Sequence, residues 1–333
     1  MSTNPPGAPA RKKRPHPARR ARKVVGWSAA DRRLRAMGTD VHLMAVDAPA
    51  GALDGAEALL ADLESRWSRF LPDSELSRIN DHPGLPVMVS EPTFSVVSQA
   101  IDGWWSTSGR YDPSVLPALV AAGYDRPFRQ LDHASASDAP ATAAPPADPT
   151  PGCADVQLLA EISAVIVPEG VALDLGGIGK GAAADRVVGS LLAAGAAGAC
   201  ANVGGDVSVA GTGPDGAGWV VGIDGADGEQ LEVLSLASGG IATTSPSTRR
   251  WTRPDGADAH HLIDPATGRP ASNGPRSVTV VAGSAATAEV LSKAVWLAPD
   301  LLDEVLGATG AACLVADHDG VVRTAGPWRE LVA

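Results

Sequence analysis

The second half of the chain consists mainly of short apolar runs, several of which follow one another directly. Runs rich in Val, Ile and Leu between Gly, Pro and Asp are typical of β-strands. They lie at about 163–175, 199–210, 218–224, 231–237, 276–283 and 312–317. Helical patterns interrupt them at about 180–195, 287–297 and 299–307. Strands that outnumber helices and occur in succession favour an α+β fold over a regularly alternating parallel sheet.

Two helices are predicted in the first half. The segment "GALDGAEALLADLESRWSRF" spaces its apolar residues by three and four, which is typical of an amphipathic helix. That stripe consists of Leu59, Leu60, Leu63, Trp67 and Phe70. A second helix is predicted at about 91–108, because Ser90 can cap it and Pro92 suits its first turn. We interpret the intervening "LPDSELSRIN" as turn and cap residues.

The charge of the chain is unevenly distributed. The 333 residues carry a net charge of −11, yet residues 1–30 contain eight Lys or Arg and no acid. This Pro-rich basic segment has too few apolar residues to fold, so we predict a disordered tail, interpreted as solubilising rather than as a nucleic-acid or lipid contact. Residues 31–333 form the predicted domain, with a flexible Pro/Ala-rich insertion at about 126–152.

Targeting and redox signals are weak. The basic tail is followed by "VVGWSAADRRL", which becomes charged too soon for an export signal, and no apolar run suits a membrane span. Cys153, Cys200 and Cys313 have no paired spacing, so neither a zinc site nor a disulfide framework is predicted. We expect a cytoplasmic protein with no membrane span and no specific nucleic-acid partner; the oligomeric state stays open.

The glycine-rich stretch "LDLGGIGKG", residues 173–181, suggests an anion site. The nucleotide motif GxxxxGK[ST] fails, because Asp174 replaces its first glycine and Gly181 replaces its hydroxyl residue. A dinucleotide pattern GxGxx[GA] fits Gly177, Gly179 and Ala182, but no regular βαβαβ alternation follows.

The physical content of this stretch does not need either motif. Small residues let backbone N–H groups approach an anion, a helix begins near Gly179, and Lys180 adds a full charge. The alternative is a tight turn from strand to helix with an exposed lysine.

Two further stretches carry candidate polar residues. "NVGGDVSVAG" places Asp206 after a pair of glycines, and "HHLIDPATGRPAS" places His260 beside His261. Side chains alternate along an extended segment, so these two histidines should point to opposite faces. At most one of them is expected to be catalytic.

Taken together, the motifs resemble the ApbE family, the FAD:protein FMN transferases, from about residue 34 to 325. The resemblance is carried in order by "MGTDVHLMAV", "SRFLPDSELSRIN", "STSGRYDPSV", "LDLGGIGKGAAADRV", "NVGGDV", "GWVVGID", "ATTS" and "HLIDPATGRP". It implies a single T-fold-like α+β domain with mixed or antiparallel sheets and flanking helices. It also implies a magnesium-dependent enzyme that cleaves FAD, joins FMN by a phosphoester to a Thr or Ser of an acceptor flavoprotein, and releases AMP.

The resemblance also implies roles for particular residues. His261 matches the family's His before Ile-Asp-Pro and is the candidate base, while Lys180 and the glycine loop would hold the diphosphate. Asp174 and Asp206 either touch substrate or hold loop geometry through backbone N–H groups. The flavin or its ribityl chain is assigned to Met37, Gly38 and Thr39, and the adenosine side to Arg110, Tyr111 and Asp112. Further cofactor-binding candidates are Gly176, Asp206, Ser245 and Ile263.

The implied metal site departs from the family pattern. That pattern combines the carbonyl of Gly179 with an Asp and a Thr in ADxLxT, but "TAEVLSKAV" places Glu289 and Lys293 there. An ammonium group cannot ligate Mg²⁺. Either magnesium binds through the remaining oxygens, or Lys293 takes part of the metal's place as a point charge, or the two residues form an i,i+4 pair and the metal site is lost.

Two smaller departures concern substrate contacts. Pro246 stands where the family favours Gly, and Ala182 stands where Tyr is common. We therefore expect altered substrate contacts near Ser245 and altered flavin affinity. The competing hypotheses are an FAD-binding carrier or sensor that has lost metal and activity, and a Rossmann-type nicotinamide oxidoreductase that rests on the GxGxxA overlay alone.

Overall fold

The computed structural model describes residues 28–131, 148–225, 228–253, 256–307 and 309–333. Most of the predicted tail at 1–30 and the centre of the predicted insertion at 126–152 lie outside these residues. The described ends of the insertion contact the rest of the chain: α5 (Phe128–Leu131) packs Phe128 against an apolar cluster, and the hydroxyl of Thr150 bonds to Asp112.

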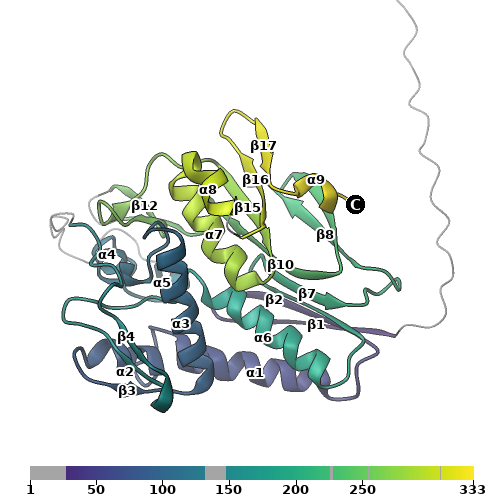
Figure 1. The fold of residues 1–333 in the computed structure, drawn as a ribbon, viewed down its shortest axis with the longest axis horizontal. Helices are drawn as coiled ribbons and strands as arrows, with labels where there is room; N and C mark the ends of the chain where they lie inside the picture. The colour runs from purple at the N-terminus through teal and green to yellow at the C-terminus, as the bar shows by residue number, and fades with distance from the viewer. Residues whose placement is uncertain (1–27, 132–147, 226–227, 254–255, 308) are drawn as a thin grey trace, which may run out of the picture.

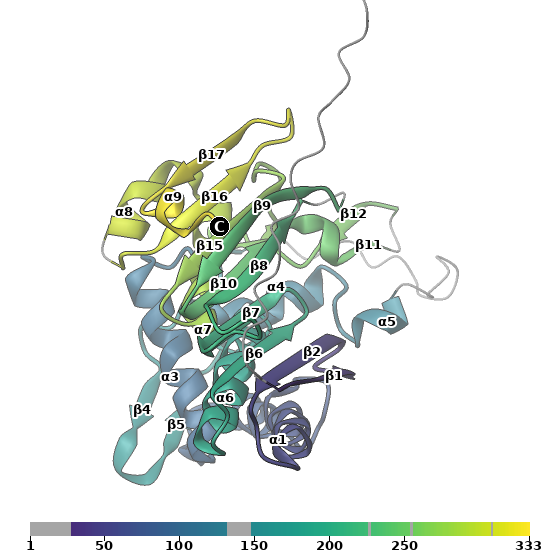
Figure 2. The same ribbon diagram turned by 90° about the vertical axis from the view of Figure 1, so that its right-hand side faces the viewer.

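The largest sheet has eight strands, and each is antiparallel to its neighbour. Figures 1 and 2 show it from two directions. Its order is β1 (Ala29–Ala36), β2 (Thr39–Val46), β6 (Gly198–Val203), β7 (Asp206–Gly211), β10 (Ser238–Thr244), β15 (Ser277–Ala282), β16 (Ala312–Ala316) and β17 (Val322–Ala325). The predicted α+β class is confirmed. The Rossmann hypothesis is wrong, since it requires parallel strands around the glycine loop.

Helices cover one face of this sheet and a β-ribbon covers the other (Figures 1 and 2). The helical face carries α6 (Gly179–Ala193) and α7 (Ala285–Leu297), with α1 (Ala52–Trp67) and α3 (Glu91–Ser106) packed beyond them. The opposite face carries β8 (Trp219–Asp224), β9 (Gln230–Leu236) and α9 (Trp328–Leu331). The central strands β6, β7, β15 and β16 are buried on both faces, which explains why they read as apolar runs rather than as alternating ones.

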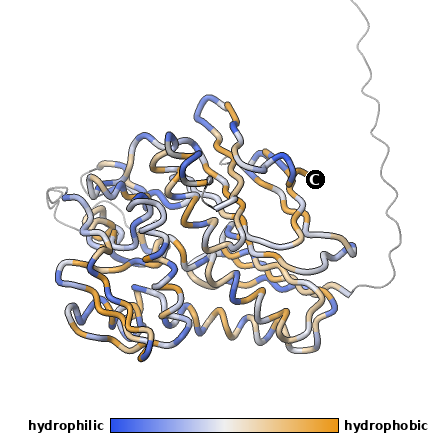
Figure 3. The backbone as a smooth tube through the Cα atoms, in the orientation of Figure 1, coloured by the Kyte–Doolittle hydropathy of each residue, from blue (hydrophilic) through white to orange (hydrophobic). Residues whose placement is uncertain are grey.

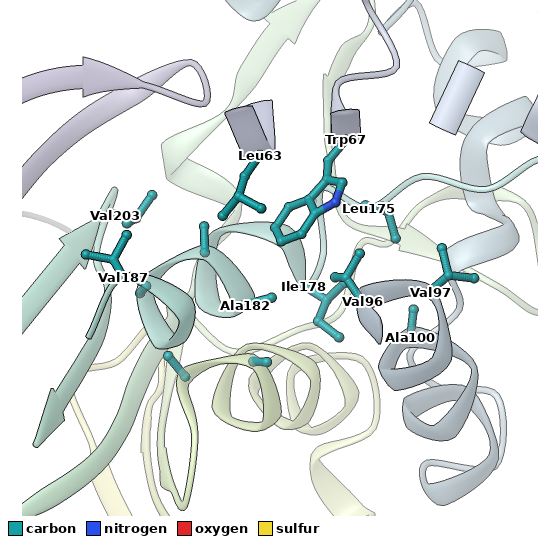
Figure 4. Packing of buried hydrophobic residues seen from close by; sticks show 14 of the residues in the cluster. Leu63, Trp67, Val96, Val97, Ala100, Leu175, Ile178, Ala182, Val187 and Val203 are labelled. Atoms are coloured by element: carbon teal, nitrogen blue, oxygen red, sulfur yellow. The ribbon is translucent and has the colours of Figure 1, made fainter. Parts of the chain in front are cut away.

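The core under the helices is built around Trp67, at the C-terminal end of α1. Figure 4 shows its ring beside Leu63, Ile178 and Ala182. Leu60, Leu63 and Trp67 are at most 4% exposed, so these members of the predicted stripe face the core. Burying each such side chain contributes roughly 1.5–3 kcal/mol. Phe70 lies beyond the end of α1 and packs against another apolar cluster. Outer loops are hydrophilic in contrast to this core, as Figure 3 shows for the turn between β16 and β17.

Several strand and loop predictions need correction. The predicted strand 199–210 is the hairpin β6–β7, turning at Gly204 and Gly205, which both have positive φ. The predicted strand 163–175 shortens to β5 (Ala164–Ile166), paired with β3 (Val87–Met88) and β4 (Gln157–Leu159). Four strands of the large sheet, β1, β2, β10 and β17, were not predicted. In two of them the reason is plain, since "AADRRLRA" of β1 is charged and "SGGIATT" of β10 is rich in glycine.

Two helix starts also differ from expectation. "LPDSELSRIN" is not merely a turn, since it forms α2 (Glu75–Asp81), capped by Ser74 accepting the N–H of Ser77 at 3.0 Å. Ser90 does precede α3, but its hydroxyl donates to Glu75 Oε2 at 2.7 Å instead of capping the helix.

Shorter elements complete the described chain. They are η1 (Pro113–Val115), α4 (Leu116–Ala121), η2 (Ala160–Ile162), η3 (Pro246–Thr248), β11 (Arg250–Thr252), β12 (Asp258–His260), β13 (Ile263–Asp264), β14 (Arg269–Pro270), η4 (Pro299–Leu301) and α8 (Leu302–Gly307). Cys153, Cys200 and Cys313 are free thiols in this structure. Within the described ranges, no helix combines the length and apolar character that a membrane span needs.

Helices α6 and α7 meet in a close contact that fixes the geometry of the glycine loop. A Cβ added at Gly181 would lie 2.4 Å from the carbonyl oxygen of Ala285. The carboxylate of Asp185 accepts the N–H groups of Ala285 and Ala286, both at 2.9 Å, which satisfies the first turn of α7. The beginning of α6 is thereby held against α7.

We predict that Gly181→Ala lowers the free energy of unfolding by about 1–3 kcal/mol, because the added methyl group collides with backbone atoms. Gly189→Ala is the matched control in the same helix, where an added Cβ has no neighbour within 4 Å. This variant should raise the free energy of unfolding by up to about 1 kcal/mol, because Ala favours a helix more than Gly does. Urea denaturation measures both. Equal stability of the two variants would show that the helices are not in close contact at Gly181.

Candidate active site

Two adjoining cavities lie beside the glycine loop, with volumes of about 290 and 70 Å³. Tyr124, Asp174, Gly176 and Arg249 line both of them. The first cavity lies between the end of α1, the β1–β2 turn and α5. The second lies between η1, the segment after β12, and α7. The larger volume is close to the lower end of the range for small-molecule sites, about 300–1,000 Å³.

The structure brings most of the predicted site residues to these cavities. The first is lined by Met37, Gly38, Gly176, Gly179 and Lys180. The second is lined by Arg110, Tyr111, Asp112, Gly176, His261, Ile263 and Lys293. Met37 reaches the first cavity through a two-residue hairpin turn in which Met37 and Gly38 have φ values of 52° and 71°. Such turns need positive φ at both positions, which Gly38 adopts without strain.

Three predicted cofactor-binding residues, Thr39, Asp206 and Ser245, line neither cavity. Thr39 lies against Gly204, where an added Cβ would be 2.4 Å from its hydroxyl oxygen. The hydroxyl of Ser245 donates to the carbonyl of Arg276 at 3.0 Å and accepts the N–H of Ser247 at 3.3 Å. The side chain of Ser245 therefore supports local backbone, and that of Thr39 packs against the β6–β7 turn. Ala182 likewise faces the core rather than a cavity.

Asp174 holds the glycine loop in place. Its Oδ1 accepts the N–H of Gly176 at 2.7 Å, and its Oδ2 lies 2.7 Å from Nε of Arg69. The guanidinium of Arg69 also donates to the carbonyl of Tyr124 and lies over the rings of Phe70 and Tyr124, 4.2 and 4.6 Å from their centroids. Asp174 was expected either to touch substrate or to hold the loop, and these contacts favour the second role.

Three residues that line the cavities were not predicted from the sequence. Arg69, Tyr124 and Arg249 line the first cavity, and Arg249 Nη1 donates to the hydroxyl of Tyr124 at 3.1 Å. Arg69 stands within the quoted motif "SRFLPDSELSRIN", and Arg249 within "ATTSPSTRRW". The available signal was an Arg inside a motif that carries the family resemblance.

Four charged residues form a buried cluster behind the loop, here called the charge cluster: Lys180, Asp206, Glu289 and Lys293. Lys180 Nζ contacts Asp206 Oδ2 and lies 2.6 Å from Glu289 Oε1. Lys293 Nζ lies 3.2 Å from the same Oε1. Glu289 Oε2 accepts the N–H of Gly181 at 2.9 Å, and this carboxylate is 1% exposed. Asp206 therefore pairs with a lysine rather than with loop N–H groups.

The charges in this cluster shift one another's pKa values. Burial opposes ionisation of Glu289, but the ammonium groups of Lys180 and Lys293 lower its pKa to about 2. Burial likewise opposes the charge on Lys180, but Asp206 and Glu289 raise its pKa to about 12. Burial and the negative charge of Glu289 raise the pKa of Asp206 to about 6. Burial lowers the pKa of Lys293, against the attraction of Glu289.

These side chains do not fit the implied magnesium centre. Magnesium requires oxygen ligands in a tight octahedron. Oε1 of Glu289 is engaged by two ammonium groups and Oε2 by a backbone N–H, while Lys293 has no ligating oxygen. In the part of the chain that the structure describes, no group of three or more His, Cys, Asp or Glu could hold a metal ion. The i,i+4 pair of Glu289 with Lys293 is present instead.

The two adjacent histidines have different environments. Nε2 of His260 lies 2.8 Å from the carbonyl of Ala271, and its Nδ1 accepts the N–H of Leu262 at 3.2 Å. His260 is therefore a structural residue. His261 lines the second cavity, where its Nδ1 lies 3.4 Å from the carbonyl of Arg249. A carbonyl only accepts, so Nδ1 carries the proton in this contact and Nε2 keeps its lone pair.

Burial and the positive charges of Arg249 and Lys293 lower the pKa of His261 well below its ordinary value. A neutral imidazole with a free lone pair can accept a proton at neutral pH. The geometry thus leaves His261, and not His260, available for proton transfer.

Tyr111 and Asp112 both line the second cavity, but only the polar group of Asp112 is satisfied by the rest of the described chain. The ring of Tyr111 lies between two glycines, since a Cβ would come within 3.2 Å of it at Gly103 and within 2.9 Å at Gly177. Its Oη is buried with no hydrogen-bond partner among the described residues. The carboxylate of Asp112 already accepts bonds from the N–H of Ser114 and the hydroxyl of Thr150.

Comparison with known proteins identifies one family. The ApbE family model matches residues 37–312. The FAD:protein FMN transferase of Vibrio cholerae is 29% identical over 265 residues, 77% of each chain, and that of Salmonella typhimurium is 30% identical over 230 residues, 67% of this chain and 64% of the relative. The crystal structure of the ApbE protein from Thermotoga maritima superposes with a TM-score of 0.79 at 27% identity, covering 92% of this chain and all of the other.

The pair of Arg69 and Asp174 gives a stability test. Their side chains are 8% and 10% exposed, so Arg69→Met leaves a buried carboxylate unpaired and should cost about 3–5 kcal/mol of unfolding free energy. Adding Asp174→Asn to that variant should recover part of the loss. Arg35→Met is the control, because its pair with Asp40 is exposed and contributes at most about 1 kcal/mol. Urea denaturation of the four proteins decides; a loss in Arg69→Met no larger than the control's contradicts the assignment.

Proposed function

This chain belongs to the ApbE family, and from that premise we propose that it is an FAD:protein FMN transferase. It binds FAD, transfers FMN to a Thr or Ser hydroxyl of an acceptor protein through a phosphoester bond, and releases AMP. The observation that carries the proposal is the pair of adjoining cavities with cationic side chains where they meet. FAD has two ring-bearing ends and a diphosphate between them, so its charge pattern matches this arrangement.

The first cavity suits the flavin end. It is lined by Met37 and Trp67, which offer apolar surface for a ring system, and by the glycine loop. The second cavity suits the adenosine end, beside Arg110 and Tyr111. Lys180 faces the first cavity, Lys293 the second, and Arg249 both, so the diphosphate lies among three cations.

His261 is the proposed base. The proton of the acceptor hydroxyl passes to its Nε2 as the hydroxyl oxygen bonds to the phosphorus on the riboflavin side. The bond from that phosphorus to the bridging oxygen breaks, and AMP leaves with that oxygen. The cations stabilise the charge that develops on the transferring and leaving phosphates. Magnesium dependence, which the family resemblance implies, has no fitting side chains here, so no step of this mechanism uses a metal.

A second candidate function is an FAD carrier or sensor without transferase activity. The charge cluster favours it, because the family's metal-binding residue types are replaced. Incubation with FAD and an acceptor protein of the Vibrio cholerae relative separates the two, with that relative as the positive control. We expect AMP and covalently bound FMN in equal amounts. Retained FAD with neither product supports the carrier.

For His261→Gln, we expect kcat to fall by roughly 10²–10⁴-fold, because the hydroxyl loses its proton acceptor, while FAD affinity changes little. Measurement combines single-turnover transfer with FAD titration. His82→Gln, at an exposed histidine, should match the wild type. Comparable kcat in all three proteins would remove His261 from the mechanism.

The pH profile separates a base from a structural histidine. A base acts unprotonated, and the lowered pKa of His261 keeps it unprotonated to a lower pH than usual. Wild-type kcat/KM should therefore change little between about pH 8 and about pH 6, whereas an ordinary imidazole would lose about three quarters of its base form. A fourfold drop at the acidic end contradicts this assignment.

A further inference from the structure

We propose that the ammonium of Lys293 takes the place of a divalent cation against the diphosphate of FAD, so that this chain binds FAD, and transfers FMN, without Mg²⁺. The inference rests on the proposed function for the identity of the ligand. It goes beyond that function by assigning a metal-independent cation to the site.

The first argument is position. Lys293 lies on α7 one turn after Glu289, and its side chain reaches the glycine loop. A Cβ built on Gly177 would lie 3.4 Å from both Cδ and Cε of Lys293. The side chain is 15% exposed and lines the second cavity, while its Nζ lies 3.2 Å from Glu289 Oε1. A cation in this place can contact an anion held by the loop.

The second argument is charge. The charge cluster holds two ammonium groups and two carboxylates, and both ammonium groups share Oε1 of Glu289. A divalent cation placed there would lie against two positive charges. It would also find both carboxylate oxygens of Glu289 already engaged. The four charges of the cluster cancel, so its net charge favours neither a metal ion nor an anion, and a metal ion is disfavoured because those oxygens are engaged. A diphosphate in the second cavity would instead meet Lys293 and Arg249, which both line that cavity.

The third argument is an unpartnered donor at the same glycine. The ring of Tyr111 would lie 2.9 Å from a Cβ on Gly177, so Tyr111 and Lys293 flank the same residue. Tyr111 is 3% exposed, and among the described residues its Oη has no hydrogen-bond partner. A buried hydroxyl without a partner costs free energy, and a phosphate oxygen would satisfy it. The side chains of Tyr111 and Lys293 thus both contact Gly177 of the loop, and the phenol is a donor that a phosphate oxygen could satisfy.

The first test is FAD binding, measured by titration calorimetry in EDTA and in MgCl₂. We expect the wild type to bind FAD equally in both. Lys293→Met should bind at least tenfold more weakly in both, because it loses the charge and gains no ligand. Lys293→Arg keeps the charge and should stay within a few-fold of the wild type. Arg323→Met, on the exposed strand β17, is the matched control for loss of a cation elsewhere.

The second test restores the family pattern. The double variant Glu289→Asp with Lys293→Thr supplies an acid and a hydroxyl one turn apart. We expect it to bind FAD weakly in EDTA and to regain affinity in MgCl₂. Thermal melts followed by circular dichroism confirm that each variant is folded. A folded double variant that ignores Mg²⁺ while Lys293→Met binds normally would overturn the inference.

FMN transfer to the acceptor, measured in the same two buffers, completes the set. Equal transfer in EDTA and MgCl₂ supports the inference. If the wild type requires Mg²⁺ for FMN transfer or for FAD binding, the inference is overturned and the proposed function stands. Absence of transfer, with FAD binding that is indifferent to Mg²⁺ and dependent on Lys293, supports this inference and removes the proposed function. A wild type that binds no FAD overturns both.

Discussion

The carboxylate of Glu289 is the contact on which the site depends, because it joins three parts of the fold. One oxygen binds Lys180 and Lys293 and the other binds the N–H of Gly181, so α7 is linked to the beginning of α6. Lys180 continues the link to Asp206 at the start of β7. This arrangement is buried, and a buried charge is stable only when it is paired and hydrogen-bonded. The close packing at Gly181 allows the helices to approach near enough for these bonds.

The rest of the site follows from that junction. With α6 fixed against α7, the glycine loop lies between the two cavities, and Asp174 with Arg69 fixes its other end. The cations then face a common space from different elements, as a transferase of a phosphate-linked group requires. The same bonds engage the oxygens of Glu289 that a metal would need. The internal pairing of these charges therefore also explains why this cluster does not fit a metal ion.

Much of the fold was predictable from sequence, and the failures have physical reasons. Helices α1, α3, α6 and α7 carry clear apolar periodicity or caps, and most strands carry apolar runs. The edge strand β1 and the glycine-rich β10 lack those signals, because their pairing comes from tertiary neighbours. At the site, the motifs indicated His261, Lys180 and Lys293, and all three line the cavities. Arg69 and Tyr124 were missed, since only the folded chain places them together.

The central claim is that a lysine ammonium, and not a metal ion, meets the diphosphate in this site. A crystal structure of the FAD complex grown with MnCl₂ tests it most directly, because manganese is visible by anomalous scattering. We predict the Nζ of Lys293 within hydrogen-bond distance of a phosphate oxygen, with Glu289 still bound to Lys180, and no manganese peak at the charge cluster. A manganese peak coordinated by Glu289 and the carbonyl of Gly179, with Lys293 turned away, would contradict the account.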